Sequence, residues 1–147
     1  MRDVDTMQAG YSTWMEHDSD DAGVAIDRAG PSRSTREVLE SHLALRREQD
    51  LEADLRANYS PAVVVLSAEG INRGHDALRM TARILRGYVP EAGYDYHELL
   101  VDGEYGLLTW SARAEDLRIH DGADSYVVRD GRIVMQTIHY STSPADV

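Results

Sequence analysis

Histidine and aspartate are the side chains through which this sequence could do chemistry, and that chemistry would be proton transfer. The chain has no cysteine, so a thiol nucleophile, a disulfide framework and a cysteine-based zinc or iron–sulfur site are excluded. No P-loop, dinucleotide fingerprint or Gly-x-Ser-x-Gly elbow occurs, and no two histidines have the i, i+4 spacing of a helical zinc site. We therefore expect no metal and no cofactor. The histidines are His17, His42, His75, His97, His120 and His139.

His42 is the histidine whose surroundings single it out. It lies within a stretch of helical spacing and shares a face with Val38, Leu39 and Leu43. Histidine exchanges protons near neutral pH, so one that faces an apolar interior can act as a general acid or base. The other interpretation, a core histidine whose ring nitrogens are satisfied by neighbours, stays open.

Composition limits the partners of this chain. It has 147 residues, a mass of 16.4 kDa, a net charge of −11 and an isoelectric point of about 4.8. Such a charge disfavours nucleic acid and anionic membranes as partners, and no apolar run approaches the roughly 20 residues that span a bilayer. With no secretory signal at the N-terminus, we expect a cytoplasmic protein. All fifteen basic residues are arginine, which indicates a GC-rich, bacterial genome.

The folded domain is expected to begin at Ser34. Ser34 and Glu37 have the spacing of a capping box, which starts a helix. We predict a domain over 34–143, an acidic N-terminal extension over 1–33 and a short C-terminal tail over 144–147.

The extension allows two interpretations. It is flexible or loosely docked, or its apolar residues pack into a groove of the same or a neighbouring subunit. Those residues are Tyr11, Trp14 and Met15.

Periodicity predicts helices first and a run of strands after them. The two Asp-Gly pairs at 102–103 and 130–131 are hairpin turns. This order predicts an α+β fold with helices on one face of a curved antiparallel sheet. The expected helices are 34–46, 50–59 and 75–85, and the expected strands are 62–66, 71–74, 94–101, 105–113, 118–129 and 132–141.

Three segments in this order resemble the nuclear-transport-factor-2-like superfamily, which includes ketosteroid isomerases, limonene epoxide hydrolases, scytalone dehydratases and SnoaL-like polyketide cyclases. They are Asp50–Tyr59 running into Val63–Leu66, Arg73–Leu78, and the last hairpin at Asp124–Ile133. The resemblance implies a cone, in which a strongly bent antiparallel sheet wraps a long N-terminal helix, with three main helices and a blind, mostly apolar cavity. Fold alone does not give function in such a family.

The resemblance also implies a set of site positions. His42 stands where a ketosteroid isomerase has a tyrosine, Ser67 where it has its base, Asp121 where it has an oxyanion acid, and Tyr140 where it has an aromatic wall. The loss of the base argues against ketosteroid isomerase activity. A pair of His42 and Asp121 inside the cone could act as a general base or activate a water. The alternative for Asp121, which precedes Gly122, is that it shapes a β-bulge.

The expected ligand-binding set surrounds this pair. Alternation along the last strand places Gln136, Ile138 and Tyr140 inward, and at most one of His97 and Glu98 faces the cavity. The full set is Tyr59, Ser67, Trp110, Gln136, Ile138 and Tyr140.

We expect a small apolar or aromatic ligand and cofactor-free acid–base catalysis of the isomerase, cyclase, dehydratase or hydrolase type. The alternative is a non-catalytic binding or dimerisation module whose cavity its own side chains fill. The outer sheet face, which carries Met135, Thr137 and His139, is expected to form a homodimer interface.

Overall fold

The computed structural model describes residues 32–90 and 93–145, and these contain three helices and seven strands. Most of the expected N-terminal extension and the last two residues of the C-terminal tail lie outside these ranges. The elements are α2 (Thr35–Arg47), α3 (Leu51–Asn58), β1 (Tyr59–Ser67), β2 (Gly70–Arg73), α4 (His75–Tyr88), β3 (Tyr94–Asp102), β4 (Tyr105–Arg113), β5 (Leu117–Arg129), β6 (Arg132–His139) and β7 (Ser143–Pro144).

The helix starts follow the capping signals in the sequence. The Ser34 hydroxyl accepts a hydrogen bond from the Glu37 backbone N–H, and the Glu37 carboxylate accepts one from the Ser34 N–H, which confirms the predicted capping box. The Asp50 side chain caps α3 by accepting from the Ala53 N–H. These contacts satisfy backbone donors that a helix end leaves without partners.

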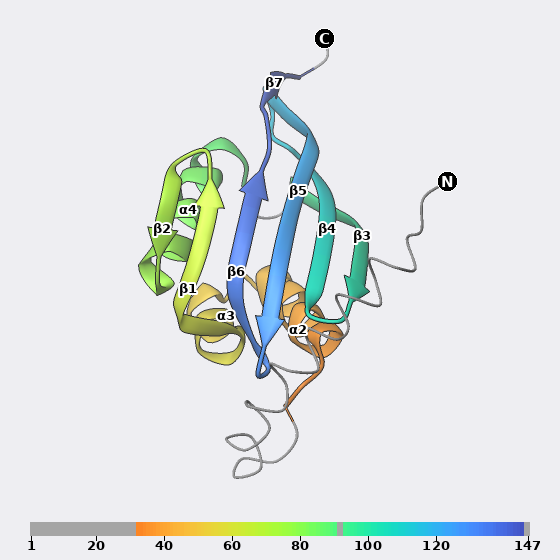
Figure 1. The fold of residues 1–147 in the computed structure, drawn as a ribbon. Coiled ribbons are helices and arrows are strands. Elements are labelled where there is room, and N and C mark those ends of the chain that lie inside the picture. The colour runs from red at the N-terminus through yellow and green to blue at the C-terminus, as the bar shows by residue number, and fades with distance from the viewer. Residues whose placement is uncertain (1–31, 91–92, 146–147) are drawn as a thin grey trace, which may run out of the picture. The chain divides into compact units, whose positions relative to one another are not determined.

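The strands form one mixed sheet in the order β2-β1-β6-β5-β4-β3, with β7 paired to β5 (Figure 1). All neighbouring pairs are antiparallel except β1 and β6, which run parallel. The sequence led us to expect a purely antiparallel sheet. The parallel pair arises because the chain enters β1 directly from α3 and returns to it only through the last hairpin.

The three helices lie behind the sheet in the view of Figure 1, and none of the described helices covers the face turned to the viewer. Helix α2 contacts β4, β5 and β6, whereas α4 contacts β1 and β2. The core between the two layers is apolar and includes the fully buried Val38, Leu39, Leu55, Val65 and Ile119. The predicted α+β architecture is confirmed.

Extra residues interrupt the strand register at several points and bend the sheet. In β3 the register shifts between Tyr96 and Glu98, so His97 is the extra residue. As a result both His97 and Glu98 are exposed, and the His97 Nε2 lies 2.8 Å from the Ser111 hydroxyl. Neither residue faces the interior, because the bulge breaks the simple alternation.

A close approach between neighbouring strands depends on Gly122. It pairs with Trp110 across β4 and β5. A Cβ at position 122 would lie 2.2 Å from the Trp110 ring. The ring is only 3% exposed and its Nε1–H is bonded to Asp124, so it has little freedom to move.

We expect Gly122→Ala to lower the free energy of unfolding by about 2 kcal/mol, because overpacking forces the ring or the strand to shift. Urea titration measures the loss. Gly87→Ala is the control, since a Cβ there meets nothing within 4 Å and alanine favours a helix. A Gly122→Ala protein as stable as the control would show that the Trp110 ring is not held in place.

Candidate functional site

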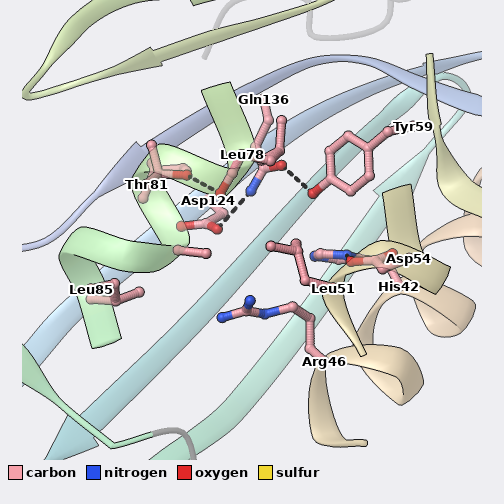
Figure 2. Close-up of a pocket in the computed structure, with 12 residues that line it drawn as sticks. His42, Arg46, Leu51, Asp54, Tyr59, Leu78, Thr81, Leu85, Asp124 and Gln136 are labelled. Carbon is pink, nitrogen blue, oxygen red and sulfur yellow. Dashed lines mark hydrogen bonds and ion pairs between the residues drawn. The ribbon is translucent and has the colours of Figure 1, made fainter. Parts of the chain in front are cut away.

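A cavity lies between the helices and the concave side of the sheet, and we call it the main cavity (Figure 2). It holds about 420 Å³ of space between atoms, part of it open to solvent. Helices α2, α3 and α4 supply one side, and β1, β5 and β6 supply the other. Its lining residues are His42, Arg46, Leu51, Asp54, Tyr59, Leu78, Thr81, Ala82, Leu85, Asp124, Gln136 and Ile138.

A second cavity, which we call the aromatic cavity, has about 300 Å³ of space between atoms, part of it open to solvent. It shares His42, Arg46, Leu85 and Asp124 with the first. The rest of its wall comes mainly from aromatic side chains of β3, β4 and β5. Those are Tyr94, Tyr96, Trp110 and Tyr126. The shared residues are therefore the ones that a ligand in either cavity would meet.

One buried chain of polar groups runs through His42. Its Nδ1 lies 2.7 Å from the Asp54 Oδ2, and its Nε2 lies 3.2 Å from the Tyr126 hydroxyl. Burial holds the pKa of Tyr126 well above the ordinary value of a phenol, so this hydroxyl keeps its proton and can donate it. In the tautomer that satisfies both contacts, His42 donates from Nδ1 to Asp54 and accepts at Nε2 from Tyr126. Asn58 donates to the other Asp54 oxygen at 2.9 Å.

A second chain of polar groups ends at Asp124. The Tyr59 hydroxyl donates to the Gln136 Oε1 at 2.5 Å, and the Gln136 Nε2 donates to the Asp124 Oδ2 at 3.0 Å. The Trp110 Nε1–H donates to the Asp124 Oδ1, also at 3.0 Å. Figure 2 shows the link from Tyr59 through Gln136 to Asp124.

The Asp124 carboxyl is electrostatically unusual. Burial raises its pKa above the ordinary aspartate value, and the hydrogen bonds from Trp110 and Gln136, which favour the ionised form, offset only part of that effect. A carboxyl with a raised pKa on a cavity wall is the kind of group that exchanges protons with a ligand.

The structure does not bring Asp121 and His42 together. Asp121 is exposed, and its carboxylate accepts hydrogen bonds from the Ser141 backbone N–H at 2.9 Å and the Ser141 hydroxyl at 2.6 Å. These two bonds lower the Asp121 pKa. Asp121 is exposed because β5 has one extra residue between Ile119, which pairs with Ala112, and Gly122, which pairs with Trp110. The bulge interpretation of Asp121 therefore matches the strand pairing, and Asp54 takes the place beside His42.

The other expected site residues divide into three groups. Tyr59, Gln136 and Ile138 line the main cavity, and Trp110 lines the aromatic cavity. Tyr140 lines neither cavity but packs against the Trp110 ring, with a centroid distance of 5.8 Å.

Ser67 lies at the end of β1, away from both cavities. Its hydroxyl donates to the Glu69 carboxylate at 3.1 Å and accepts from the Glu69 backbone N–H at 3.2 Å. It is a turn residue, not a group that a ligand in either cavity would meet.

Among the cavity residues that sequence reasoning missed are Arg46, Asp54, Asp124 and Tyr126, and each of these had a signal. Arg46 follows His42 by one helical turn. Asp54 lies between Leu51 and Leu55 on the inward face of its helix, where a polar residue is unexpected. Asp124 and Tyr126 alternate in phase with an inward valine at position 128.

Comparison with known proteins gives the family. The sequence model of the SnoaL-like domain matches residues 39–136, which is more than half of the chain. The chain therefore belongs to the SnoaL-like family of the nuclear-transport-factor-2-like fold. Among curated proteins, none matches the sequence.

Solved structures share the fold. A nuclear-transport-factor-2-like protein of unknown function from Burkholderia xenovorans superposes with a TM-score of 0.57 at 19% identity, covering 73% of this chain and 82% of that one. TerC, co-crystallized with polyporic acid, gives 0.57 at 18% identity, covering 73% and 91%. A protein described as a SnoaL-like polyketide cyclase from Mesorhizobium loti gives 0.52 at 16% identity, covering 74% and 100%.

We expect Asp54→Ala to cost about 3 kcal/mol of unfolding free energy, because it leaves the His42 Nδ1–H and the Asn58 amide buried without an acceptor. Asp54 is 0% exposed. Urea titration measures the cost. The control is Glu40→Ala, which removes only an exposed pair with Arg36 and should cost less than about 0.5 kcal/mol. Equal losses in the two variants would contradict a structural role for the buried pair.

Proposed function

We propose that this protein binds a small, largely apolar ligand in the main cavity and moves a proton on it without a cofactor. The reaction class is isomerisation, cyclisation, dehydration or water addition. The observation that carries the proposal is the Asp124 carboxyl, which lies on the wall of both cavities with its pKa raised by burial. A carboxylate base becomes stronger as its pKa approaches the working pH.

The polar neighbours of Asp124 fit the role of a base. Trp110 and Gln136 donate one hydrogen bond to each of its oxygens, which fixes the carboxyl plane and leaves each oxygen with further acceptor capacity. His42 has both ring nitrogens engaged, so we assign it to positioning the Tyr126 hydroxyl and not to proton abstraction. TerC, which shares the fold, was co-crystallized with polyporic acid, and this supports a small molecule as the ligand.

One observation favours a second candidate, a non-catalytic binding or dimerisation module. Among the described residues, every buried side-chain nitrogen and oxygen has a hydrogen-bond partner within the chain. The polar groups are thus satisfied without a ligand. Native mass spectrometry of the purified protein separates a ligand-binding protein from a module with a filled cavity, because a co-purified small molecule is expected only where the cavity is open.

The catalytic proposal predicts exchange of the α-protons of an enolisable probe, 2-tetralone, in D₂O. We expect Asp124→Asn to slow the protein-dependent exchange at least about 100-fold, because an amide cannot take the proton. NMR follows the loss of the α-proton signal after subtraction of the buffer rate. The matched control is Asp121→Asn on the same strand, which should exchange at the wild-type rate.

The pH profile of this exchange should follow Asp124. Only the carboxylate can accept a proton, so the rate falls as pH drops through the raised pKa and levels off above it. The midpoint should lie above the ordinary aspartate range. Two results would contradict the assignment of Asp124 as the base. One is exchange at the wild-type rate in Asp124→Asn, and the other is a loss of exchange in Asp121→Asn alone.

We further propose that the uncovered face of the sheet forms a homodimer. Strand pairing aligns one row of outward side chains across six strands, and no member of the row is charged. The row runs through Ile71, Leu66, Thr137, Ser125, Leu107 and Leu100. Ile71 is 71% exposed and Leu100 52%. An uncharged, mostly aliphatic row of this length in an open sheet face favours cover by a second copy.

Light scattering at micromolar concentration tests the dimer. We expect a dimer for the wild type and a monomer for Leu100→Glu, because a desolvated carboxylate opposes burial of the row. Leu100 is half exposed, so the charge should be tolerated in the monomer. Arg83→Glu on the exposed side of α4 is the control and should stay dimeric. A monomeric wild type would rule the interface out.

A further inference from the structure

Arg46 brings a positive charge into both cavities, and the proposed reaction does not use this charge. It lies on α2 four residues after His42, and therefore on the same helix face. It lines both the main and the aromatic cavity. Figure 2 shows its guanidinium reaching from α2 into the space beside Asp124.

The carboxyl groups around Arg46 are already engaged. The Asp54 oxygens accept from His42 and Asn58, and the Asp124 oxygens accept from Trp110 and Gln136. Within residues 32–90 and 93–145, no carboxylate lies within ion-pair distance of the Arg46 guanidinium. The Tyr96 side chain is near enough to interact with it, but it is not a carboxylate.

An arginine in a partly desolvated site loses hydration energy that a counter-charge normally restores. Its planar guanidinium matches a carboxylate, with two parallel N–H groups for the two oxygens. The arginines elsewhere on the helices show the contrast, since Arg79 pairs with both Glu52 and Asp76 at the surface. Arg46 therefore has the position and the unused charge of a ligand anchor.

We propose that the ligand is an apolar acid, with an aromatic or alicyclic body and one carboxylate that Arg46 binds. This inference deepens the proposed function and rests on it. The body of the ligand lies against the aliphatic side chains of α4 in the main cavity or against the rings of the aromatic cavity. In either place the carboxylate reaches Arg46, and the ring or its neighbouring carbon lies toward Asp124, because these two residues belong to both cavities.

The electrostatics of the site agree with this arrangement. A carboxylate beside Arg46 is attracted by the guanidinium and repelled by any negative charge on Asp124. Arg46 also attracts the ionised form of Asp124, and this attraction offsets part of the repulsion between the two carboxylates. The two groups thus offer a cation for the acid and an adjacent proton-exchanging carboxyl for the reacting carbon.

Paired probes test the anchor. 2-Naphthoate and 2-naphthamide have the same ring and nearly the same shape, but only the first is charged. Isothermal titration calorimetry gives the affinities, and the Trp110 indole N–H shift reports entry into the cavity. We expect the wild type to bind 2-naphthoate at least about 10-fold more tightly than 2-naphthamide, which corresponds to about 1.4 kcal/mol.

Three variants localise the effect. Arg46→Gln should bind both probes with the affinity of the amide, and Arg46→Lys should keep part of the preference because it keeps the charge. Arg36→Gln, an exposed position on the same helix, should behave as the wild type. A thermal melt of each variant establishes that it is folded. A merely structural Arg46 would alter both affinities alike.

The outcomes separate this inference from the proposed function. Equal binding of the two probes by the wild type, or an equal loss of both in Arg46→Gln, overturns the anchor and leaves ligand binding intact. A preference that survives in Arg46→Gln also overturns it. If neither probe binds at millimolar concentration, the result contradicts both the proposed ligand site and the role of Arg46 as its anchor.

Discussion

A hydrogen-bonded pair of buried side chains, His42 and Asp54, is the interaction on which the interior of this domain depends. Neither residue can be left alone in an apolar core, since an unpaired polar group there costs several times what a satisfied one contributes. The pair therefore fixes α2 against α3 at one relative position. Through Tyr126 it also fixes α2 against the sheet.

The polar groups of the cavity form two separate systems with different properties. The system around His42 is closed, because each ring nitrogen has a partner and the carboxyl behind it is shared with Asn58. His42 and Asp54 also line the main cavity, but both His42 ring nitrogens have partners, whereas each Asp124 oxygen has one donor and further acceptor capacity. A closed system gives rigidity, and an open one leaves capacity for a ligand. This difference is the basis on which we propose a supporting role for His42 and proton transfer for Asp124.

Local signals in the sequence were enough to predict most of the fold. The Ser34 capping box, the two Asp-Gly turns and the change from helical to alternating periodicity depend on neighbours along the chain, and the structure confirms each element they predicted. The parallel pairing of β1 with β6 was not predictable in this way, because it joins segments about seventy residues apart. The SnoaL-like family match agrees with the resemblance on which the cone was expected.

The candidate site was less predictable, and the bulges explain why. The resemblance placed Asp121 in the cavity through its spacing to Asp124. In the structure, one extra residue in β5 shifts the alternation of that strand, and Asp121 is exposed. The carboxyl that reaches the cavity is three residues later, at Asp124. The same effect in β3 exposes both His97 and Glu98. His42, on a regular helix, was placed inward by periodicity alone.

The contacts of Arg33 bear on the order in which the chain can fold. Its guanidinium donates to the Asn58 side chain, to the Ala57 carbonyl and to the Gly131 carbonyl in the turn between β5 and β6. Arg33 and Gly131 are separated by 98 residues, so during synthesis the helices leave the ribosome long before the turn that completes this contact. The strand that joins β1 to the rest of the sheet, β6, emerges later still. A chain released before that point would lack the strand that joins β2 and β1 to β5, β4 and β3. Assembly of the complete sheet is therefore a late event.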